Sequence, residues 1–201
     1  MTMSIRPIRT AALSLAAVSL LAAPVAANGY REKGKAVTIA GTKLSVTPPR
    51  DWNLLSIRPG KKAETWTLAG ERLNEITWYA GIEPDEPLIR ETSRKTKPLP
   101  RLKRATLLAE IPELLETTYR TERQVADFTL TASAPDPFLG QPGIRFSYAY
   151  VDNDHLPRRG EARAALIGGR LYLATFDAPR QYFFDRSLGD FRALTDAATL
   201  S

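Results

Sequence analysis

The chain has 201 residues with no cysteine and one histidine, and its 28 basic residues outnumber its 22 acidic residues, for a net charge of +6. The absence of cysteine excludes disulfides, thiol nucleophiles, iron–sulfur ligation and cysteine zinc sites. The modest positive charge favours weak attraction to anionic surfaces and is not typical of a dedicated nucleic-acid-binding protein, so no nucleic-acid partner is expected.

Residues 1–27 have the layout of a secretory signal peptide. Arg6 and Arg9 precede an uncharged run rich in Ala and Leu over residues 11–23, and small residues then lead to a cleavage site after about Ala27. A transmembrane anchor is the alternative, but a helix of this run spans about 20 Å, whereas the hydrocarbon core measures about 30 Å. Cleavage near Ala27 predicts a periplasmic or secreted protein. Because Arg6 and Arg9 are removed, its net charge is lower by two than that of the full chain.

The first part of the mature chain alternates apolar and polar residues, which is the pattern of strands with one buried face. Gly41 and Thr42 separate two of these runs and predict a hairpin. Three further strands follow, and Trp66 and Trp78 lie on their apolar faces as expected core residues. The strands are expected over 36–40, 43–47, 52–57, 64–70 and 74–82.

The middle of the chain changes character. Residues 83–104 contain four prolines and little periodicity, which predicts a long surface loop or crossover. The segment IPELLETTYRTER at 111–123 predicts a helix, because Pro112 suits its first turn, Glu113 lies near its N-terminus and Arg120 near its C-terminus. Its apolar residues recur every three or four positions and form one stripe.

Four more strands are expected in the second half of the chain, over 127–133, 143–151, 161–167 and 170–176. Gly168 and Gly169 lie between the last two, and a Gly pair between alternating runs predicts a two-residue hairpin. A phosphate-binding loop is the alternative, but neither GxGxxG nor GxxxxGK occurs at this pair, and no cofactor is expected.

The C-terminal segment predicts an amphipathic helix that packs on the sheet, preceded by a turn at 177–179. Its apolar residues follow helical spacing, and Phe191 is expected in the core together with Phe146 of the strand over 143–151. The stripe consists of Phe184, Leu188, Phe191, Leu194 and Ala198.

These elements predict an α+β fold with an antiparallel sheet of about six to eight strands and helices packed on it, in a single domain over 28–201. The element order and the stretches KLSVTPPRDWNLLS, LNEITWYAGI and GEARAALIGGRLYLATFDAP resemble the PsbP-like fold. Members of that fold are accessory or binding proteins, so the resemblance implies a non-catalytic binding or assembly module of the cell envelope. It supplies no catalytic residues, and a shared fold does not fix function.

Few residues offer catalytic or metal chemistry. His155 lies in the polar turn DNDHLPRRG, which is a poor platform for catalysis, and the sequence has no GxSxG nucleophile motif. Asp152 and Asp154 match the start of a calcium loop, but Leu156 and Pro157 occupy its next ligand and glycine positions. We therefore expect a solvated turn there, without a metal.

A carboxylate-based envelope hydrolase is the alternative function, because two acids at a suitable separation can cleave a glycosidic bond. Glu75, Glu161 and Asp177 lie at ends of the expected strands, but the sequence does not show which of them pair. A pocket that holds two acids, one with a raised pKa, beside Trp or Tyr would favour this alternative.

The segment RETSRKTKPLPRLKR at 90–104, called the basic loop below, carries seven basic residues and one acidic residue. It predicts a docking surface for anionic lipid or an acidic envelope protein, and a solvated loop without a partner is the alternative. Nucleic acid is a poor fit, because the segment has no aromatic residue on which bases could stack. The candidate binding residues are Arg94, Lys95, Lys97, Arg101, Lys103 and Arg104.

Overall fold

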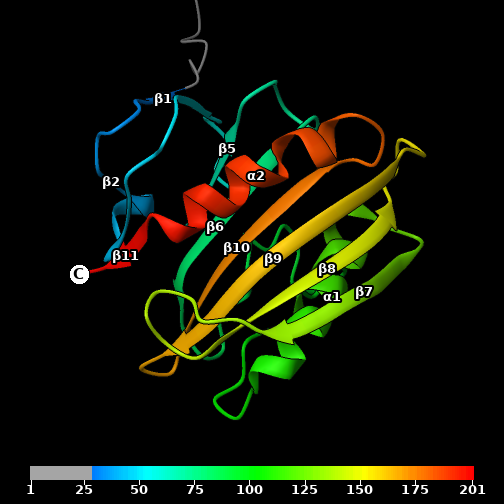
Figure 1. The fold of residues 1–201 in the computed structure, drawn as a ribbon. Helices are drawn as coiled ribbons and strands as arrows, with labels where there is room; N and C mark the ends of the chain where they lie inside the picture. Colours follow the sequence, from blue (N-terminus) through cyan, green and yellow to red (C-terminus); the bar gives the residue numbers. More distant parts are fainter. Residues whose placement is uncertain (1–28) are drawn as a thin grey trace, which may run out of the picture.

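The structure, a computed structural model, describes residues 29–201, so the predicted signal peptide and its cleavage site lie outside the described residues. An eight-stranded antiparallel sheet, in the order β1-β4-β5-β6-β10-β9-β8-β7, forms the centre of the fold (Figure 1). This confirms a mixed α+β fold built on a large antiparallel sheet. The strands are β1 (Gly29–Arg31), β4 (Trp52–Leu54), β5 (Ala63–Thr67), β6 (Glu75–Ile82), β7 (Phe128–Pro135), β8 (Gly143–Val151), β9 (Pro157–Ile167) and β10 (Arg170–Pro179).

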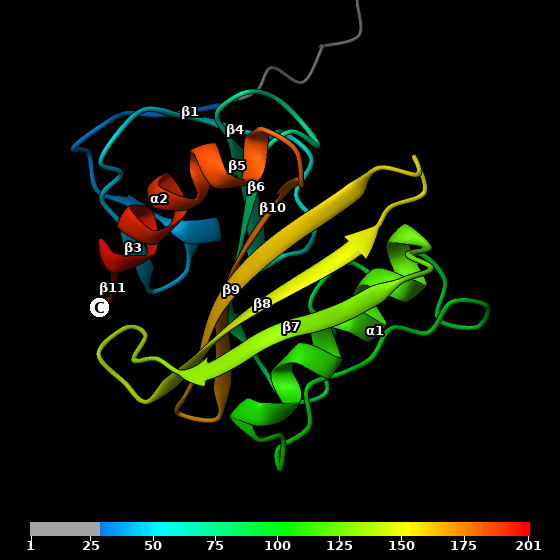
Figure 2. The same ribbon diagram turned by 45° about the vertical axis from the view of Figure 1, so that its right-hand side comes forward.

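One α-helix lies on each face of this sheet, α1 (Ile111–Arg123) behind β7 and β8 and α2 (Phe183–Asp196) across β9 and β10 (Figures 1 and 2). The helix α1 has the predicted bounds and ends at Gln124, whose positive φ of 56° closes the last turn. Two short 3₁₀ turns, η1 (Ile39–Gly41) and η2 (Leu108–Glu110), complete the helical content of residues 29–201. No helix in this range is long and apolar enough to cross a lipid bilayer.

The predicted N-terminal hairpin is present, but it is shorter than expected and does not join the main sheet. Its strands β2 (Val37–Thr38) and β3 (Leu44–Val46) form a separate sheet with β11 (Ala198–Leu200) in the order β11-β3-β2. Pairing of β11 with β3 joins the two ends of the described chain. The prediction that the C-terminal helix reaches Ala198 was therefore wrong, because that residue pairs with Val46 across the small sheet.

The central strands bury both faces, whereas the alternation predicted one polar face. Every residue of β5 and β6 is buried. Trp78 packs on the α2 side with Trp66 and Phe191, and Tyr79 packs on the α1 side with Phe146. The four predicted core residues Trp66, Trp78, Phe146 and Phe191 are each 0% exposed, so the strand phase was right. The prediction of a polar, solvated face was wrong because a helix covers each face of the sheet, so polar side chains of the central strands are buried as well.

The hairpin predicted at Gly168 and Gly169 is confirmed. The two glycines have φ values of 57° and 74°, which a two-residue primed turn requires, and they join β9 to β10. The predicted turn at 177–179 is wrong, because β10 continues to Pro179. Asp177 lies in the ladder opposite Glu75 on one side and Gly160 on the other, and this extension of β10 positions the site described next.

Candidate binding site

The structure brings together two of the three acids singled out from the sequence and separates the third. Glu75 on β6 and Asp177 on β10 are direct cross-strand partners on the α1 side of the sheet. Glu161 lies on the opposite side, where Arg192 of α2 donates two hydrogen bonds to its carboxylate at 2.8 and 2.7 Å. Glu161 therefore tethers α2 to β9 and contributes nothing to a site with the other two acids.

The carboxylate of Asp177 is deeply buried and held by two tyrosines. Its side chain is 2% exposed, and it accepts hydrogen bonds from the hydroxyls of Tyr119 at 2.6 Å and Tyr148 at 3.0 Å. Burial raises the pKa of Asp177, and the negative charge of Glu75 raises it further, while Arg123 and the two hydroxyls act in the opposite direction. The net effect is a raised pKa, so Asp177 holds its proton to a higher pH than an aspartic acid in water does.

The tyrosines belong to a packed aromatic group. Burial raises the pKa of Tyr119, Tyr148 and Tyr150 well above the usual value for tyrosine, so all three stay protonated donors. The Tyr119 and Tyr150 rings meet edge to face at 5.6 Å between centroids. A Cβ atom at Gly160 would lie 2.2 Å from the Tyr148 ring, so only glycine at that position lets Tyr148 lie flat over β9.

Arg123, the last residue of α1, completes the group. Its guanidinium lies 4.4 Å from the centroid of the Tyr119 ring and donates to the hydroxyl of Tyr150 at 3.2 Å. It also lies 3.7 Å from the carboxylate of Glu75, and its side chain stays 28% exposed. We call Glu75, Tyr119, Arg123, Tyr148, Tyr150 and Asp177 together the Asp177 cluster.

A cavity of about 200 Å³ opens onto this cluster. Its outer wall is an ion-pair group in which Arg158 lies 2.6 Å from Asp154 and 3.4 Å from Asp152, and Arg72 lies 3.6 Å from Asp152. These arginines neutralise the carboxylates that the sequence placed in a fragment of a calcium loop. Among residues 29–201, no group of three histidine or acidic side chains is arranged to hold a metal ion.

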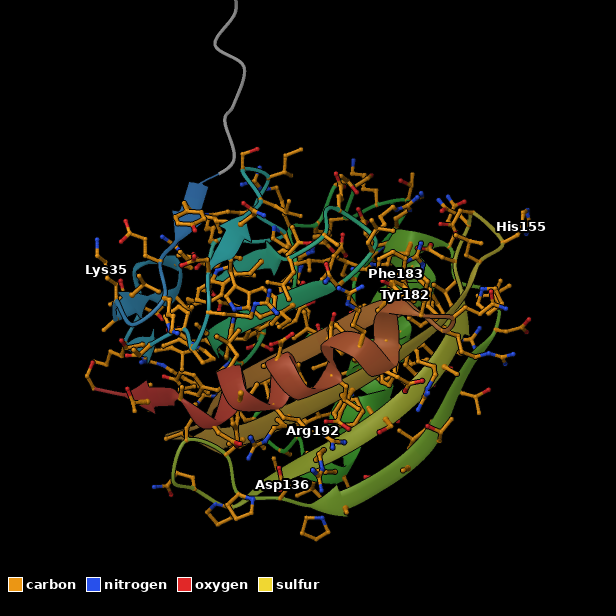
Figure 3. The ribbon with its side chains drawn as sticks, turned by 45° about the horizontal axis from the view of Figure 1, so that its top comes forward. Lys35, Asp136, His155, Tyr182, Phe183 and Arg192 are labelled. Carbon is orange, nitrogen blue, oxygen red and sulfur yellow. The ribbon has the colours of Figure 1, made fainter. Side chains whose placement is uncertain are left out.

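His155 lies apart from the Asp177 cluster. It is an exposed residue with a φ of 61° in the turn between β8 and β9. Figure 3 shows its side chain at the tip of that turn, pointing away from the fold and far from Asp136 and Arg192. The structure thus places it where the sequence predicted, in a solvated turn.

A trough runs from the Asp177 cluster along the α1 side of β5 and β6. Two hollows of about 330 Å³ each form it, and both have Ile57, Pro59 and Arg123 in their walls. Glu71 and Glu75 line one of these hollows and also the cavity of about 200 Å³ described above. The floor consists of Thr65, Thr67, Thr77 and Tyr79, and the outer walls include Arg58, Ile89, Arg90 and Thr92.

The structure divides the six residues predicted as a docking surface into two groups. Arg101 is partly buried, and its guanidinium donates to the carboxylate of Glu91 at 2.6 Å and to the carbonyl of Asp85 at 2.7 Å. The other five form no ion pair with a described residue and are exposed; they are Arg94, Lys95, Lys97, Lys103 and Arg104. We call these five the exposed cations.

The basic loop is anchored on the fold, although its charges face solvent. Leu99 and Leu102 are 5% and 1% exposed, and Leu102 belongs to the apolar core on the α1 side of the sheet. The backbone of Leu102 also exchanges hydrogen bonds with the segment that starts the crossover, at Asp85 and Glu86. The loop therefore presents its cations from a fixed base.

Sequence reasoning missed the polar role of the tyrosines and of Arg123. Tyr148 and Tyr150 lie on the buried face of β8 and Tyr119 on the apolar stripe of α1, at positions that the alternation of the strand and the periodicity of the helix indicate. The available signal was their hydroxyls, because a buried tyrosine usually finds a polar partner. Such residues on one buried face indicate buried polar partners: Asp177 accepts from Tyr119 and Tyr148, and Arg123 donates to Tyr150.

Comparisons with solved structures identify the fold. The chain is similar to cyanobacterial PsbP from Synechocystis sp. PCC 6803, with a TM-score of 0.54 and 12% identity over 93% of this chain and 99% of that one. It also matches LpqN of Mycobacterium tuberculosis, which is involved in cell envelope biogenesis, with a TM-score of 0.35 and 9% identity over 90% of this chain and 87% of that one. No protein-family model and no curated protein matches the sequence.

Proposed function

We propose that this chain, which has the PsbP-like fold, is exported and serves as a non-catalytic binding module of the cell envelope that docks on anionic lipid through its basic loop. The fold supports a binding role, because the solved cyanobacterial PsbP shares it over nearly the whole chain. The observation that carries the proposal is the group of five exposed cations on an anchored loop, without acidic partners among residues 29–201.

Lipid is favoured over an acidic protein by a neighbouring apolar side chain. Leu107 follows the basic loop and is 65% exposed, so an apolar residue lies next to the cations. A lipid surface accepts both features, since basic residues are attracted to anionic headgroups and an apolar side chain can enter the acyl boundary. Each basic residue near such a surface contributes about 1 kcal/mol, which is roughly fivefold in affinity.

The test is binding of the mature protein, residues 28–201, to vesicles with and without anionic lipid. Replacing Arg94, Lys95, Lys97, Lys103 and Arg104 with glutamine should abolish binding. A matched variant with glutamine at Lys33, Lys35, Lys43, Arg180 and Arg186, which are exposed elsewhere, removes the same charge and should bind more strongly than the first variant. Equal loss in both would mean that net charge alone attracts the protein, and capture of an acidic envelope protein without vesicle binding would replace lipid as the partner.

A carboxylate-based envelope hydrolase is the second candidate, because the structure places Glu75 and Asp177 together beside tyrosines, with the pKa of Asp177 raised. The arrangement disfavours catalysis in one respect: Asp177 is 2% exposed and engaged by two hydroxyls, so it has little access to a substrate. Release of soluble fragments from purified peptidoglycan decides between the candidates. If the protein is a binding module, no soluble fragments should be released. Release of fragments by the parent that is abolished in both Asp177→Asn and Glu75→Gln would establish the hydrolase.

A further inference from the structure

The trough has charges of opposite sign at its two ends. Glu71 and Glu75 lie at the end where β6 begins, and Glu71 forms no ion pair with a described residue. Arg58 and Arg90 line the other end together with Glu122, and both arginines are exposed without an acidic partner in residues 29–201, so positive charge is in excess there. A ligand that carries a positive charge at one end and a negative charge at the other matches this distribution.

The length of the trough follows from the strand beneath it. Glu75 lies at one end of the floor and Tyr79 at the other, and four residues of strand span about 13 Å. An extended peptide of three residues measures about 10 Å. Each hollow, at about 330 Å³, also falls within the usual range of ligand sites, about 300–1,000 Å³.

The middle of the trough suits peptide groups. The hydroxyls of Thr65 and Thr77 lie 2.9 Å apart on the floor and can still bond to a ligand amide or carbonyl. Ile57, 83% exposed, offers an apolar contact at the rim. The backbone amide of Arg90 donates to the carbonyl of Pro59 at 2.7 Å, which fixes the two walls at the positive end relative to each other.

We propose that the trough binds a short extended peptide with free ends, its ammonium beside Glu71 and Glu75 and its carboxylate beside Arg58 and Arg90. Arg123, which lines both hollows and lies 3.7 Å from Glu75, donates to a peptide carbonyl near the ammonium end. Arg90 and Thr92 of the basic loop line this site, but the five exposed cations do not, so removing those five side chains should leave peptide binding intact.

Isothermal titration of the mature protein with trialanine, N-acetyl-trialanine and trialanine amide tests the proposal. Free trialanine should bind saturably, and blocking either end should weaken binding about tenfold, because each end loses one charge-assisted contact. Equal affinity for all three peptides, or no binding of trialanine to protein that circular dichroism shows to be folded, would overturn it.

Substitutions at the two ends of the trough test which end binds the peptide ammonium and which binds its carboxylate. Glu71→Gln should weaken binding of trialanine about threefold to tenfold and leave the N-acetyl peptide unaffected. Arg90→Gln should weaken binding of trialanine by a similar factor and leave binding of trialanine amide unaffected. Arg180→Gln, an exposed change outside the trough, and the variant without the five exposed cations should both bind trialanine like the parent. Loss of binding in the latter would place the peptide on the five exposed cations and contradict the trough.

Discussion

Replacing Asp177 with asparagine should change how the stability of the protein depends on pH. Burial raises the pKa of Asp177, so the folded protein holds this proton to a higher pH than the unfolded chain does. The folded state then binds more protons than the unfolded state, and the free energy of unfolding falls as pH rises. This loss begins near the unfolded pKa of about 3.9 and ends above the raised folded pKa.

The slope gives the size of the effect. One proton of difference corresponds to about 1.4 kcal/mol for each pH unit within that window. Asparagine has nearly the same shape and does not titrate, so Asp177→Asn should gain stability relative to the parent as pH rises through the window. The tyrosine hydroxyls at 2.6 and 3.0 Å donate to different oxygens of Asp177, so asparagine keeps an oxygen acceptor for one of them and its amide NH₂ can donate to the other hydroxyl.

Urea unfolding of the parent and the variant from acidic to neutral pH measures this difference. Asp127→Asn, an exposed acid near the end of α1, serves as the matched control and should show no comparable dependence on pH. If the parent instead gained stability over Asp177→Asn with rising pH, Asp177 would be ionised in the folded protein, and the attraction to Arg123 would outweigh burial.

Four other substitutions test the packing by urea denaturation. Gly160→Ala should cost about 1–3 kcal/mol or more, because its Cβ would lie 2.2 Å from the Tyr148 ring, and a neutral effect would show that the ring is free to move. Gly168→Val should destabilise the protein by at least about 1 kcal/mol while Gly168→Asn costs less, since a φ of 57° suits asparagine; equal costs would argue against the primed turn. Gly189→Ala should stabilise α2 by about 1 kcal/mol, as its Cβ meets nothing within 4 Å, and a loss would indicate an unseen contact. Trp66→Ala should cost about 3–5 kcal/mol, and a cost below 1 kcal/mol would be incompatible with its 0% exposure.

Local features of the fold could be predicted because their causes are local. The helix over 111–123 has its own apolar stripe and charge distribution, and the Gly168-Gly169 turn has the residues that its positive φ values require. The small sheet could not be predicted, because β3 pairs with β11 at the far end of the chain. Nothing near Val46 or Ala198 specifies such a partner.

The site shows the same division between local and distant causes. Glu75 and Asp177 were recognised as acids at strand ends, but their pairing depends on β6 lying beside β10, and the crossover, α1 and three strands separate them in the chain. The basic loop was visible as a run of charges. The role of Arg101 was not, because its partners Glu91 and Asp85 depend on how the loop closes.

The affinity of the mature protein for anionic vesicles as a function of ionic strength tests docking through the basic loop. The Debye length shortens from about 30 Å at 0.01 M salt to about 8 Å at physiological salt, so attraction through the five exposed cations is strongly screened. We expect tight binding at low salt, a steep loss toward physiological salt and no binding to neutral vesicles. Binding that is equally strong at both salt concentrations, or equally strong to neutral vesicles, would contradict docking through the basic loop.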